Sequence, residues 1–400
     1  MNILYGVSFS GTALAFLKGQ LRHFHELGHK TALVAPDNDG ADVMKMCKEE
    51  SATFFEVPLQ RQPNLWSDVK ALFGVFRAVK SFSPDMVIAG TPKASLLVLS
   101  VSFLRRVRYR VYLCHGLRFE GFSGWKRVVA TAVERTFCAL ATDIVAVSDS
   151  VKRGLIEIGV ESSDISVLGH GSPNGIDLTR FNRAGEQERD SLRYALNILN
   201  PNGELLFVGR VTHDKGLRYL RELATAMPRT SLTLIGPIEI SRKSDTVDLE
   251  ALTQLQNVRL LGAVANVEEY MKAADVLLLP TLREGLPTVI LEAAACGLPV
   301  VAMEATGTVD AVASCEAGLL TPQGDTPLFL HAVRDLLQSE SKRSEIAARS
   351  ATLAASRFGQ EVIWSNWELY VESIGDSQHQ PKCFLRRLHG AKVRSPHDSA

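Results

Sequence analysis

The stretch REGLPTVILEAAACGLP, residues 283–299, decides how the second half of this chain folds. It follows the apolar run 275–280, which is typical of a buried parallel strand. Pro287 suits the first turn of a helix, and Gly297 followed by Pro299 ends it. Almost every residue between them is apolar or small, so we expect this helix to be buried on most sides.

Two carboxylates accompany this helix. Glu292 lies in its middle, and Glu284 lies on the loop just before it. A lone buried carboxylate is costly unless a partner compensates it, while the free N–H groups of a helix N-terminus can hold a phosphate. The arrangement suits a ligand with hydroxyls at one end and a phosphate near its middle, such as a nucleotide sugar. The alternative is a structural Glu292 paired with an arginine.

The composition is that of an ordinary globular protein long enough for two domains. The 400 residues are 46% hydrophobic and 22% charged, and the formal net charge is zero, so nothing in the overall charge indicates nucleic acid. The six cysteines show no metal-ligand spacing and fit buried thiols in a reducing compartment. The chain opens directly into an apolar strand, without the pattern of a signal peptide. We therefore predict a cytoplasmic protein.

Strands and helices alternate along both halves, which predicts two doubly wound parallel sheets. The first half opens with a strand from Ile3 and a single helix from Ser10 to Gly28. In the second half, strands are predicted at 204–209, 231–236, 257–262, 275–279 and 298–302. The fold class is thus α/β, with two facing Rossmann-like domains and a cleft between them. We predict a first domain at 1–182, a linker at 183–202, a second domain at 203–358, a helix at 359–374 that packs back on the first domain, and a basic tail at 375–400.

The residues that suggest chemistry lie at predicted strand ends, where such sheets bind ligands. Gly209 lets a ligand approach the backbone, and Arg210 with Lys215 is spaced to hold a diphosphate. The alternative is an ordinary surface pair of cations. His115 closes a strand of the first domain, and it is either a packed histidine or a group that handles a proton or hydrogen bond. No motif points to metal catalysis or hydrolysis.

Several of these residues carry a resemblance. The combination of Gly209-Arg210, Asp214-Lys215-Gly216, Glu284-Gly285-x-Pro287 and Glu292 with Gly297-x-Pro299 is similar to glycosyltransferase family 4, a family of retaining, metal-independent GT-B transferases. Matches at 91–93, 115–116, 169–177 and 305–312 resemble the bacterial branch that builds capsule, O-antigen and related lipid-linked glycans. The resemblance spans roughly residues 2 to 370.

The resemblance implies a role for each of these residues. Arg210 and Lys215 would neutralise the donor diphosphate, Glu292 would bind the ribose hydroxyls and Glu284 the transferred sugar, with His115 near the reacting centre. The remaining donor contacts would come from Gly11, Gly209, Gly236, Gly285, Leu286, Pro287 and Thr288. The first loop, residues 8–12, departs from the paired glycines of many relatives. A nucleotide sugar, UDP-linked in our prediction, would be a substrate rather than a cofactor, no metal would be required, and the acceptor would be a glycan, polyprenyl-linked in our prediction.

Two rival functions are open. One is a sugar-nucleotide 2-epimerase of the same fold, for which we identify no set of extra acid and base residues. The other is a non-catalytic nucleotide-sugar-binding subunit, which the joint presence of Arg210, Lys215, Glu284 and Glu292 argues against.

A last expectation concerns the membrane. The apolar helix 93–104 is followed by a basic stretch, Arg105 to Arg135, in which Glu120 and Glu134 are the only acids. Basic residues near an anionic leaflet are attracted to it, so these residues could hold the first domain on the inner face of the plasma membrane. The alternative is that the helix belongs to the core and the arginines form a solvated face.

Overall fold

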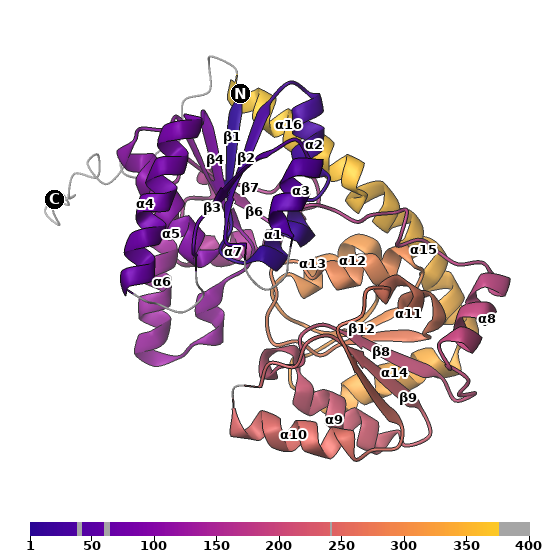
Figure 1. The fold of residues 1–400 in the computed structure, drawn as a ribbon. Helices are drawn as coiled ribbons and strands as arrows, with labels where there is room; N and C mark the ends of the chain where they lie inside the picture. The colour runs from indigo at the N-terminus through magenta and orange to yellow at the C-terminus, as the bar shows by residue number, and fades with distance from the viewer. Residues whose placement is uncertain (38–41, 60–64, 241, 376–400) are drawn as a thin grey trace, which may run out of the picture. The chain divides into compact units, whose positions relative to one another are not determined.

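The computed structural model describes residues 1–37, 42–59, 65–240 and 242–375. They divide into two compact units, each built on one parallel sheet (Figure 1). Unit 1 contains residues 1–147, 152–168 and those from Asn366 on, and unit 2 contains 148–151 and 169–365. Most of the predicted basic tail, including Cys383, lies outside the described residues. The five described cysteines are buried and free, as predicted.

Unit 1 is built on a seven-stranded sheet in the order β3-β2-β1-β4-β5-β6-β7, with all neighbours parallel. Its strands are β1 (Asn2–Gly6), β2 (Lys30–Ala35), β3 (Thr53–Glu56), β4 (Met86–Ala89), β5 (Tyr109–Cys114), β6 (Asp143–Ala146) and β7 (Ile165–Ser166). The order runs outward from β1 in both directions, so the crossover helices cover both faces of the sheet. This is the doubly wound arrangement that the alternating pattern predicted.

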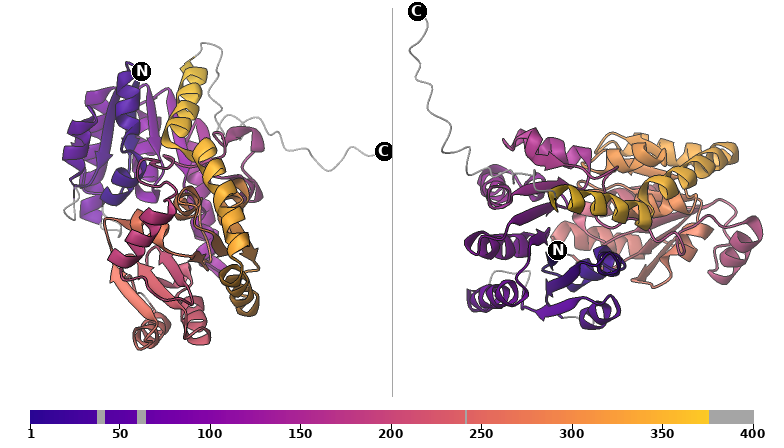
Figure 2. Two further views of the ribbon diagram at one scale, coloured as in Figure 1. Left: turned by 90° about the vertical axis from the view of Figure 1, so that its right-hand side faces the viewer. Right: turned by 90° about the horizontal axis from the view of Figure 1, so that it is seen from above.

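Three long helices, α4 (Leu65–Phe82), α5 (Pro92–Leu104) and α6 (Gly124–Leu140), pack in a row beside the strands of unit 1 (Figures 1 and 2). The other α-helices that begin in this half of the chain are α1 (Ser10–Phe16), α2 (Gln20–Glu26), α3 (Val43–Glu49) and α7 (Asp149–Glu157). The single helix predicted from Ser10 to Gly28 is therefore two helices. The buried Glu50 carboxylate accepts from the N–H groups of Gly19, at 2.8 Å, and Arg22, at 3.1 Å. This contact from a distant residue caps α2 and creates the break.

Unit 2 is built on a six-stranded parallel sheet in the order β10-β9-β8-β11-β12-β13. Its strands are β8 (Glu204–Val208), β9 (Ser231–Ile235), β10 (Val258–Gly262), β11 (Val276–Leu279), β12 (Val300–Met303) and β13 (Gly318–Thr321). The short edge strand β13 was not predicted. Its α-helices are α8 (Glu186–Ala195), α9 (Leu217–Ala226), α10 (Lys243–Thr253), α11 (Val267–Ala273), α12 (Thr288–Ala295), α13 (Thr308–Cys315), α14 (Thr326–Gln338) and α15 (Glu340–Phe358). Together the two units confirm the predicted α/β class with two doubly wound sheets.

The ends of the domains differ in detail from the predicted boundaries. Helix α8 lies inside the segment predicted as a linker, and it is part of unit 2, where Arg189 and Arg193 both pair with Asp275 at 2.6 and 3.4 Å. The last helix, α16 (Gln360–Gly375), contributes residues to both units. In unit 2, Trp364 Nε1 donates to Asn174 Oδ1 at 2.8 Å, and in unit 1 the Tyr109 hydroxyl donates to the carbonyl of Ile374 at 2.7 Å.

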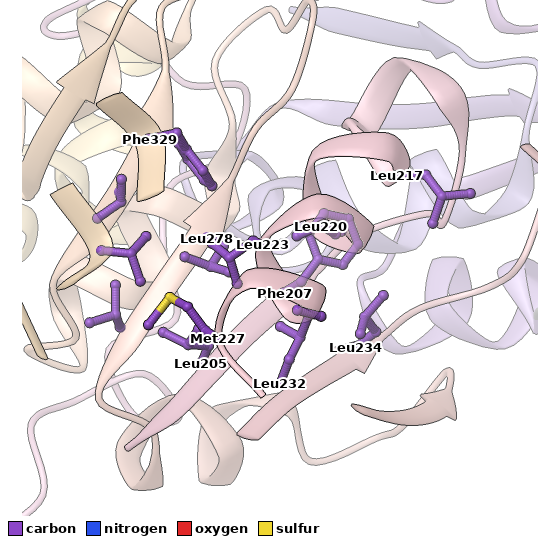
Figure 3. Close-up of a cluster of buried hydrophobic side chains, with 14 of the residues drawn as sticks. Leu205, Phe207, Leu217, Leu220, Leu223, Met227, Leu232, Leu234, Leu278 and Phe329 are labelled. Atoms are coloured by element: carbon purple, nitrogen blue, oxygen red, sulfur yellow. The ribbon is translucent and has the colours of Figure 1, made fainter. Parts of the chain in front are cut away.

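The core of unit 2 sits between β8 and the helices α9 and α14 (Figure 3). Leu205 and Phe207 alternate on β8 and point to one face of the sheet. On α9, Leu217, Leu220 and Leu223 recur every three residues, which places them on one side of the helix. All five side chains are at most 1% exposed. Burying a large apolar side chain contributes about 1.5–3 kcal/mol, so this cluster holds β8 and its site-bearing end in place.

We expect Leu220→Ala to destabilise unit 2 by about 2–5 kcal/mol, because it removes buried apolar surface and leaves a cavity. The matched control is Leu328→Ala on α14, where the leucine is exposed and its loss should change stability by about 0.5 kcal/mol or less. Chemical denaturation measures both. Equal losses from the two variants would contradict the assignment of this core.

Candidate functional site

Three glycines hold the site-bearing loops of unit 2 against one another. Gly209 follows β8 and Gly236 follows the neighbouring β9, with φ of 155° and 138°. A Cβ on Gly236 would lie 2.0 Å from the carbonyl oxygen of Gly209, and one on Gly216 would lie 2.0 Å from that of Pro280. The backbones therefore touch directly, and no larger residue fits at Gly216 or Gly236 without a shift. These contacts lie at the carboxyl ends of adjacent strands, where doubly wound sheets bind ligands.

Lys215 and Glu284 meet at this edge although 68 residues separate them in the chain. Lys215 ends a short 3₁₀ turn, His213–Lys215, after β8, whereas Glu284 lies on the loop between β11 and α12. Their side chains form an ion pair, and both are largely buried, with 19% and 13% exposed. The structure thus brings together two of the residues that the sequence singled out separately.

A second ion pair and two backbone contacts fasten the same two loops. The Asp214 carboxylate accepts from Arg283 Nε at 3.1 Å, and the Arg283 guanidinium holds the pKa of Asp214 below its usual value against the opposing effect of burial. The Asp214 carbonyl accepts from the Leu282 N–H at 2.8 Å and from the Thr281 hydroxyl at 3.0 Å. Neither Asp214 nor Arg283 was predicted as a site residue, because their contact is visible only in the folded chain.

Arg210 makes a looser contact. Its Nη1 donates to Glu239 Oε2 at 2.8 Å, and the two side chains are 45% and 40% exposed. Ion pairs this exposed contribute about 1 kcal/mol or less, so the guanidinium can exchange Glu239 for a ligand at small cost. The joint grip of Arg210 and Lys215 on one diphosphate stays a prediction.

Glu292 is the fifth residue of α12 and is half-buried there. This burial raises its pKa to about 7; nearby Arg180 lowers it and Glu268 raises it. Arg180 is engaged elsewhere, since its Nη2 donates to Glu268 Oε2 at 2.6 Å and to the Ala265 carbonyl at 3.0 Å. Among the described residues, no donor hydrogen-bonds the Glu292 carboxyl group. A structural arginine bonded directly to Glu292, the alternative raised from the sequence, is therefore not found in this part of the chain.

The loop that leads into α12 is held by two serines at the start of α7. Ser148 caps α7, because its hydroxyl accepts from the Val151 N–H at 3.3 Å. The same hydroxyl donates to the carbonyl of Gly285 at 2.8 Å. The Ser150 hydroxyl accepts from the Gly307 N–H at 2.6 Å, and the Ser150 N–H donates to the Asp310 carboxylate at 2.9 Å. The matching residues at 305–312 were noted in the sequence, but nothing local linked them to the serines.

The other predicted residues of this loop lie where α12 begins. Pro287 is the N-cap and Thr288 the first residue of α12, while Leu286 is buried. A Cβ on Gly307 would lie 1.9 Å from the carbonyl of Gly285, so the backbone of α13 approaches this loop as closely as the strand-end glycines approach each other. The positions of the polar groups at the start of α12 are therefore fixed by the residues that pack against this loop.

His115 and Gly11 belong to unit 1. The His115 ring stacks on Phe16, with centroids 5.3 Å apart and planes 16° apart, and burial lowers its pKa to about 4. The imidazole is therefore neutral at pH 7, so it can exchange a hydrogen bond but carries no charge. A Cβ on Gly90 would lie 2.4 Å from the ring, so Gly90 leaves the space that the ring fills. Gly11 lies in the first turn of α1, so the second half of the predicted loop 8–12 belongs to the helix that was predicted to begin at Ser10.

A cavity of about 520 Å³ lies at the opposite, amino-terminal edge of the unit 2 sheet, and none of the predicted site residues lines it. Its walls are basic and include Arg189, Arg193, Arg229, Arg334 and Arg343. Elsewhere, no group of three or more His, Cys, Asp or Glu in the described part of the chain could hold a metal ion. The candidate site is accordingly the carboxyl edge of the sheet, with its paired loops and Glu292.

Two family models match the chain. The model described as "Glycosyl transferase 4-like domain" covers residues 11–171, and the one described as "Glycosyl transferases group 1" covers 202–339. Between them they match most of unit 1 and the strand-end loops of unit 2. The family resemblance seen in the sequence is confirmed.

Individual relatives agree with this result. The chain is 28% identical over 361 residues to the capsular polysaccharide biosynthesis glycosyltransferase CapM of Staphylococcus aureus, covering 89% of this chain and 93% of the relative. It is 26% identical to the UDP-Gal:alpha-D-GlcNAc-diphosphoundecaprenol alpha-1,3-galactosyltransferase of Escherichia coli, covering 74% and 80%. The structure resembles that of Anabaena HepE in complex with UDP and glucose, with a TM-score of 0.77 and 21% identity over 93% of this chain and 100% of that one. This likeness confirms the predicted GT-B fold class.

The raised pKa of Glu292 predicts how the free energy of unfolding depends on pH. Its pKa is raised from 4.5 to about 7, so the unfolded chain ionises this group first, and the free energy of unfolding falls as pH rises from about 4.5 to 7. The full difference corresponds to about 3 kcal/mol. We expect Glu292→Gln to lose this dependence and to be more stable than the natural chain at pH 8. A variant that is less stable at pH 8 in chemical denaturation would show that Glu292 is a structural group.

Proposed function

Because the chain belongs to the glycosyl transferases of the group 1 and 4-like families, we propose that it moves a sugar from a UDP-sugar to a polyprenyl-diphosphate-linked glycan. The sugar is a hexose or an N-acetylhexosamine, its configuration is retained, and no metal ion is needed. The reaction serves the biosynthesis of a surface polysaccharide at the cytoplasmic face of the membrane. The observation that carries this proposal is the meeting of Lys215 and Glu284 on two loops that are tied together at the carboxyl edge of the sheet.

Each donor contact has a chemical reason. We expect the diphosphate to replace Glu284 as the partner of Lys215 and Glu239 as the partner of Arg210, since phosphate oxygens pair with both kinds of cation. Released in this way, the Glu284 carboxylate can accept from a hydroxyl of the transferred sugar. Glu292 is an acceptor for two ribose hydroxyls, and donor binding would favour its ionised form over the neutral form that burial stabilises.

The transfer step follows from these contacts. The acceptor hydroxyl forms a bond to the anomeric carbon while the bond from that carbon to the diphosphate oxygen breaks. The hydroxyl proton passes to a leaving phosphate oxygen on the same face, so the configuration is retained without a protein nucleophile. Arg210, Lys215 and the N-terminus of α12 would stabilise the charge on the leaving group. His115, neutral at pH 7, would accept or donate a hydrogen bond near the reacting centre.

The acceptor class is proposed from two kinds of support. The relative from Escherichia coli acts, by its name, on a diphosphoundecaprenol-linked sugar, and the relative from Staphylococcus aureus belongs to capsule biosynthesis. In this chain, the stretch Arg105 to Arg135 is rich in arginine and lysine, which would attract the phosphates of such an acceptor.

We expect Arg210→Ala and Lys215→Ala each to lower kcat/KM for the donor by about 10- to 100-fold, since a hydrogen bond to a charged group contributes about 1.5–3 kcal/mol. Steady-state assays with UDP-sugars and a polyprenyl-diphosphate-linked acceptor measure this. Arg349→Ala and Lys342→Ala are matched controls, because both residues lie on α15, outside the strand-end loops, and form ion pairs there. Full activity of the double variant, or loss of natural activity in EDTA, would contradict the proposal.

A second kinetic prediction concerns Glu292→Gln. The amide is a poorer acceptor for two hydroxyls than a carboxylate, so most activity should be lost while the fold is kept. Measuring turnover and stability on the same sample separates function from structure. Unchanged turnover in the folded fraction would remove Glu292 from the donor site.

The same assay decides between the proposal and its two rivals. Transfer to the acceptor is the expected outcome. Epimerised free sugar formed without acceptor would favour the 2-epimerase, and donor binding without turnover would favour the non-catalytic subunit. GDP-sugars included as a parallel arm test the choice of UDP.

A further inference from the structure

Helices α4, α5 and α6 form a row in unit 1 (Figure 1). Many of their large apolar side chains are exposed. Trp66 on α4 is 79% exposed, Leu104 at the end of α5 is 77% exposed and Trp125 on α6 is 72% exposed. Phe73 and Phe76 on α4 and Val128 on α6 are also exposed. We call this surface the three-helix face. Scattered exposed apolar residues are ordinary, but a group of this size, with two tryptophans, marks an interaction surface.

The structure corrects the expectation about which helix carries the apolar surface. Helix α5, the one singled out from the sequence, has most of one side in the core, including Val98 and Leu99, so for most of its length the alternative reading holds. The most exposed aromatic side chains, Trp66, Phe73 and Trp125, lie instead on α4 and α6. Arg110 also leaves the predicted basic group, because it is buried and donates to the carbonyls of Leu140 and Val107 at 2.8 and 2.7 Å.

The charge around this surface is strongly positive. Segments 65–82, 92–108 and 118–140 contain eleven Lys or Arg residues and only three acids, Asp68, Glu120 and Glu134. Of these acids, Asp68 pairs with Lys93 at 2.6 Å and Glu134 is buried against the Tyr112 hydroxyl. Two of the cations lie against the apolar residues themselves, with Arg105 5.5 Å from the Phe76 ring centre and Lys126 6.0 Å from that of Trp125.

We propose that the three-helix face docks in the headgroup region of an anionic lipid leaflet. The tryptophans would lie at the boundary between headgroups and acyl chains, where their rings are favoured, and the surrounding cations would pair with lipid phosphates. No helix within residues 1–37, 42–59, 65–240 and 242–375 has the length and apolar character to cross a bilayer, so the contact is with the surface of the leaflet.

The distribution of charge also indicates which partner the three-helix face binds. A second copy would bring the same positive surface against this one, and like charges would repel. An acidic protein would satisfy the cations, but it would leave the tryptophans without the boundary that an anionic membrane supplies together with negative charge. The purpose of docking, to bring the site to a lipid-linked acceptor, rests on the proposed function, whereas docking itself is measured without donor or acceptor.

Co-sedimentation of the full chain with vesicles tests the proposal. The vesicles are phosphatidylcholine alone or phosphatidylcholine with phosphatidylglycerol, at low and high salt. We expect binding only to the anionic vesicles and a decrease with salt. Trp66→Ser with Trp125→Ser should weaken binding at least tenfold at every salt concentration, and Arg105→Ser, Arg106→Ser and Arg108→Ser together should remove most of the salt-dependent part.

The controls carry equivalent changes away from the face. Tyr194→Ser with Leu199→Ser replaces exposed apolar residues of unit 2, and Arg218→Ser with Arg349→Ser replaces exposed arginines. These variants should bind as the natural chain does. Melting temperatures near that of the natural chain would show that the tryptophan and arginine variants are folded, as expected for exposed positions.

Three results would overturn the proposal: no sedimentation with anionic vesicles at low salt, undiminished binding by both face variants, or a dimer in analytical ultracentrifugation that only the tryptophan variant loses. Transfer to a water-soluble acceptor analogue is a separate readout, which the tryptophan variant should leave unchanged. Docking without any transfer activity would leave this inference standing and contradict the proposed function instead.

Discussion

The site depends on the contact between the loop after β8 and the loop after β11. Gly216 lies against the backbone of Pro280, and Asp214 binds both the Arg283 side chain and the backbone of Leu282. These contacts leave the next residue of each loop, Lys215 and Glu284, facing one another. Because β8 and β11 are neighbours in the sheet, the core beneath them fixes both loops at once. A rigid support of this kind is what a ligand-binding arrangement of charges requires.

Glu292 shows that a site of this kind can lower the stability of the fold. No donor in the described structure hydrogen-bonds its carboxyl group, and its raised pKa means that ionisation opposes folding near neutral pH. A leucine or glutamine would be a more stable choice at that position. Residues that weaken the fold without a compensating contact are frequent at functional sites, which is the physical reason to assign Glu292 to the ligand. Glu292 follows Glu284 by eight residues and lies in the second turn of α12, so it is close to the paired loops along the chain.

The overall charge of the protein conceals a strong separation. The chain is formally neutral, yet the helices and loops around the three-helix face carry a large positive excess, which the rest of the sequence balances with acids. The net charge alone therefore gives no sign of a negatively charged partner, whereas the local distribution of charge favours one. The exposed tryptophans on α4 and α6 distinguish this surface from a solvated basic face, because solvation gives no reason to expose large aromatic rings.

The sequence by itself determined the alternation of strands and helices, the two doubly wound sheets and most residues of the candidate site. These follow from short-range signals, such as the apolar run before Glu284, the glycines at 209 and 236, and the proline at 287 where a helix begins. The tertiary structure alone decided the break between α1 and α2, which Glu50 imposes from a distance, and the pairing of Ser150 with Asp310 across 159 intervening residues. It also decided which side of α4, α5 and α6 is exposed. Periodicity predicts that a helix has two faces, but only the packing of neighbouring elements determines which side is covered, because burial is a property of the assembled chain.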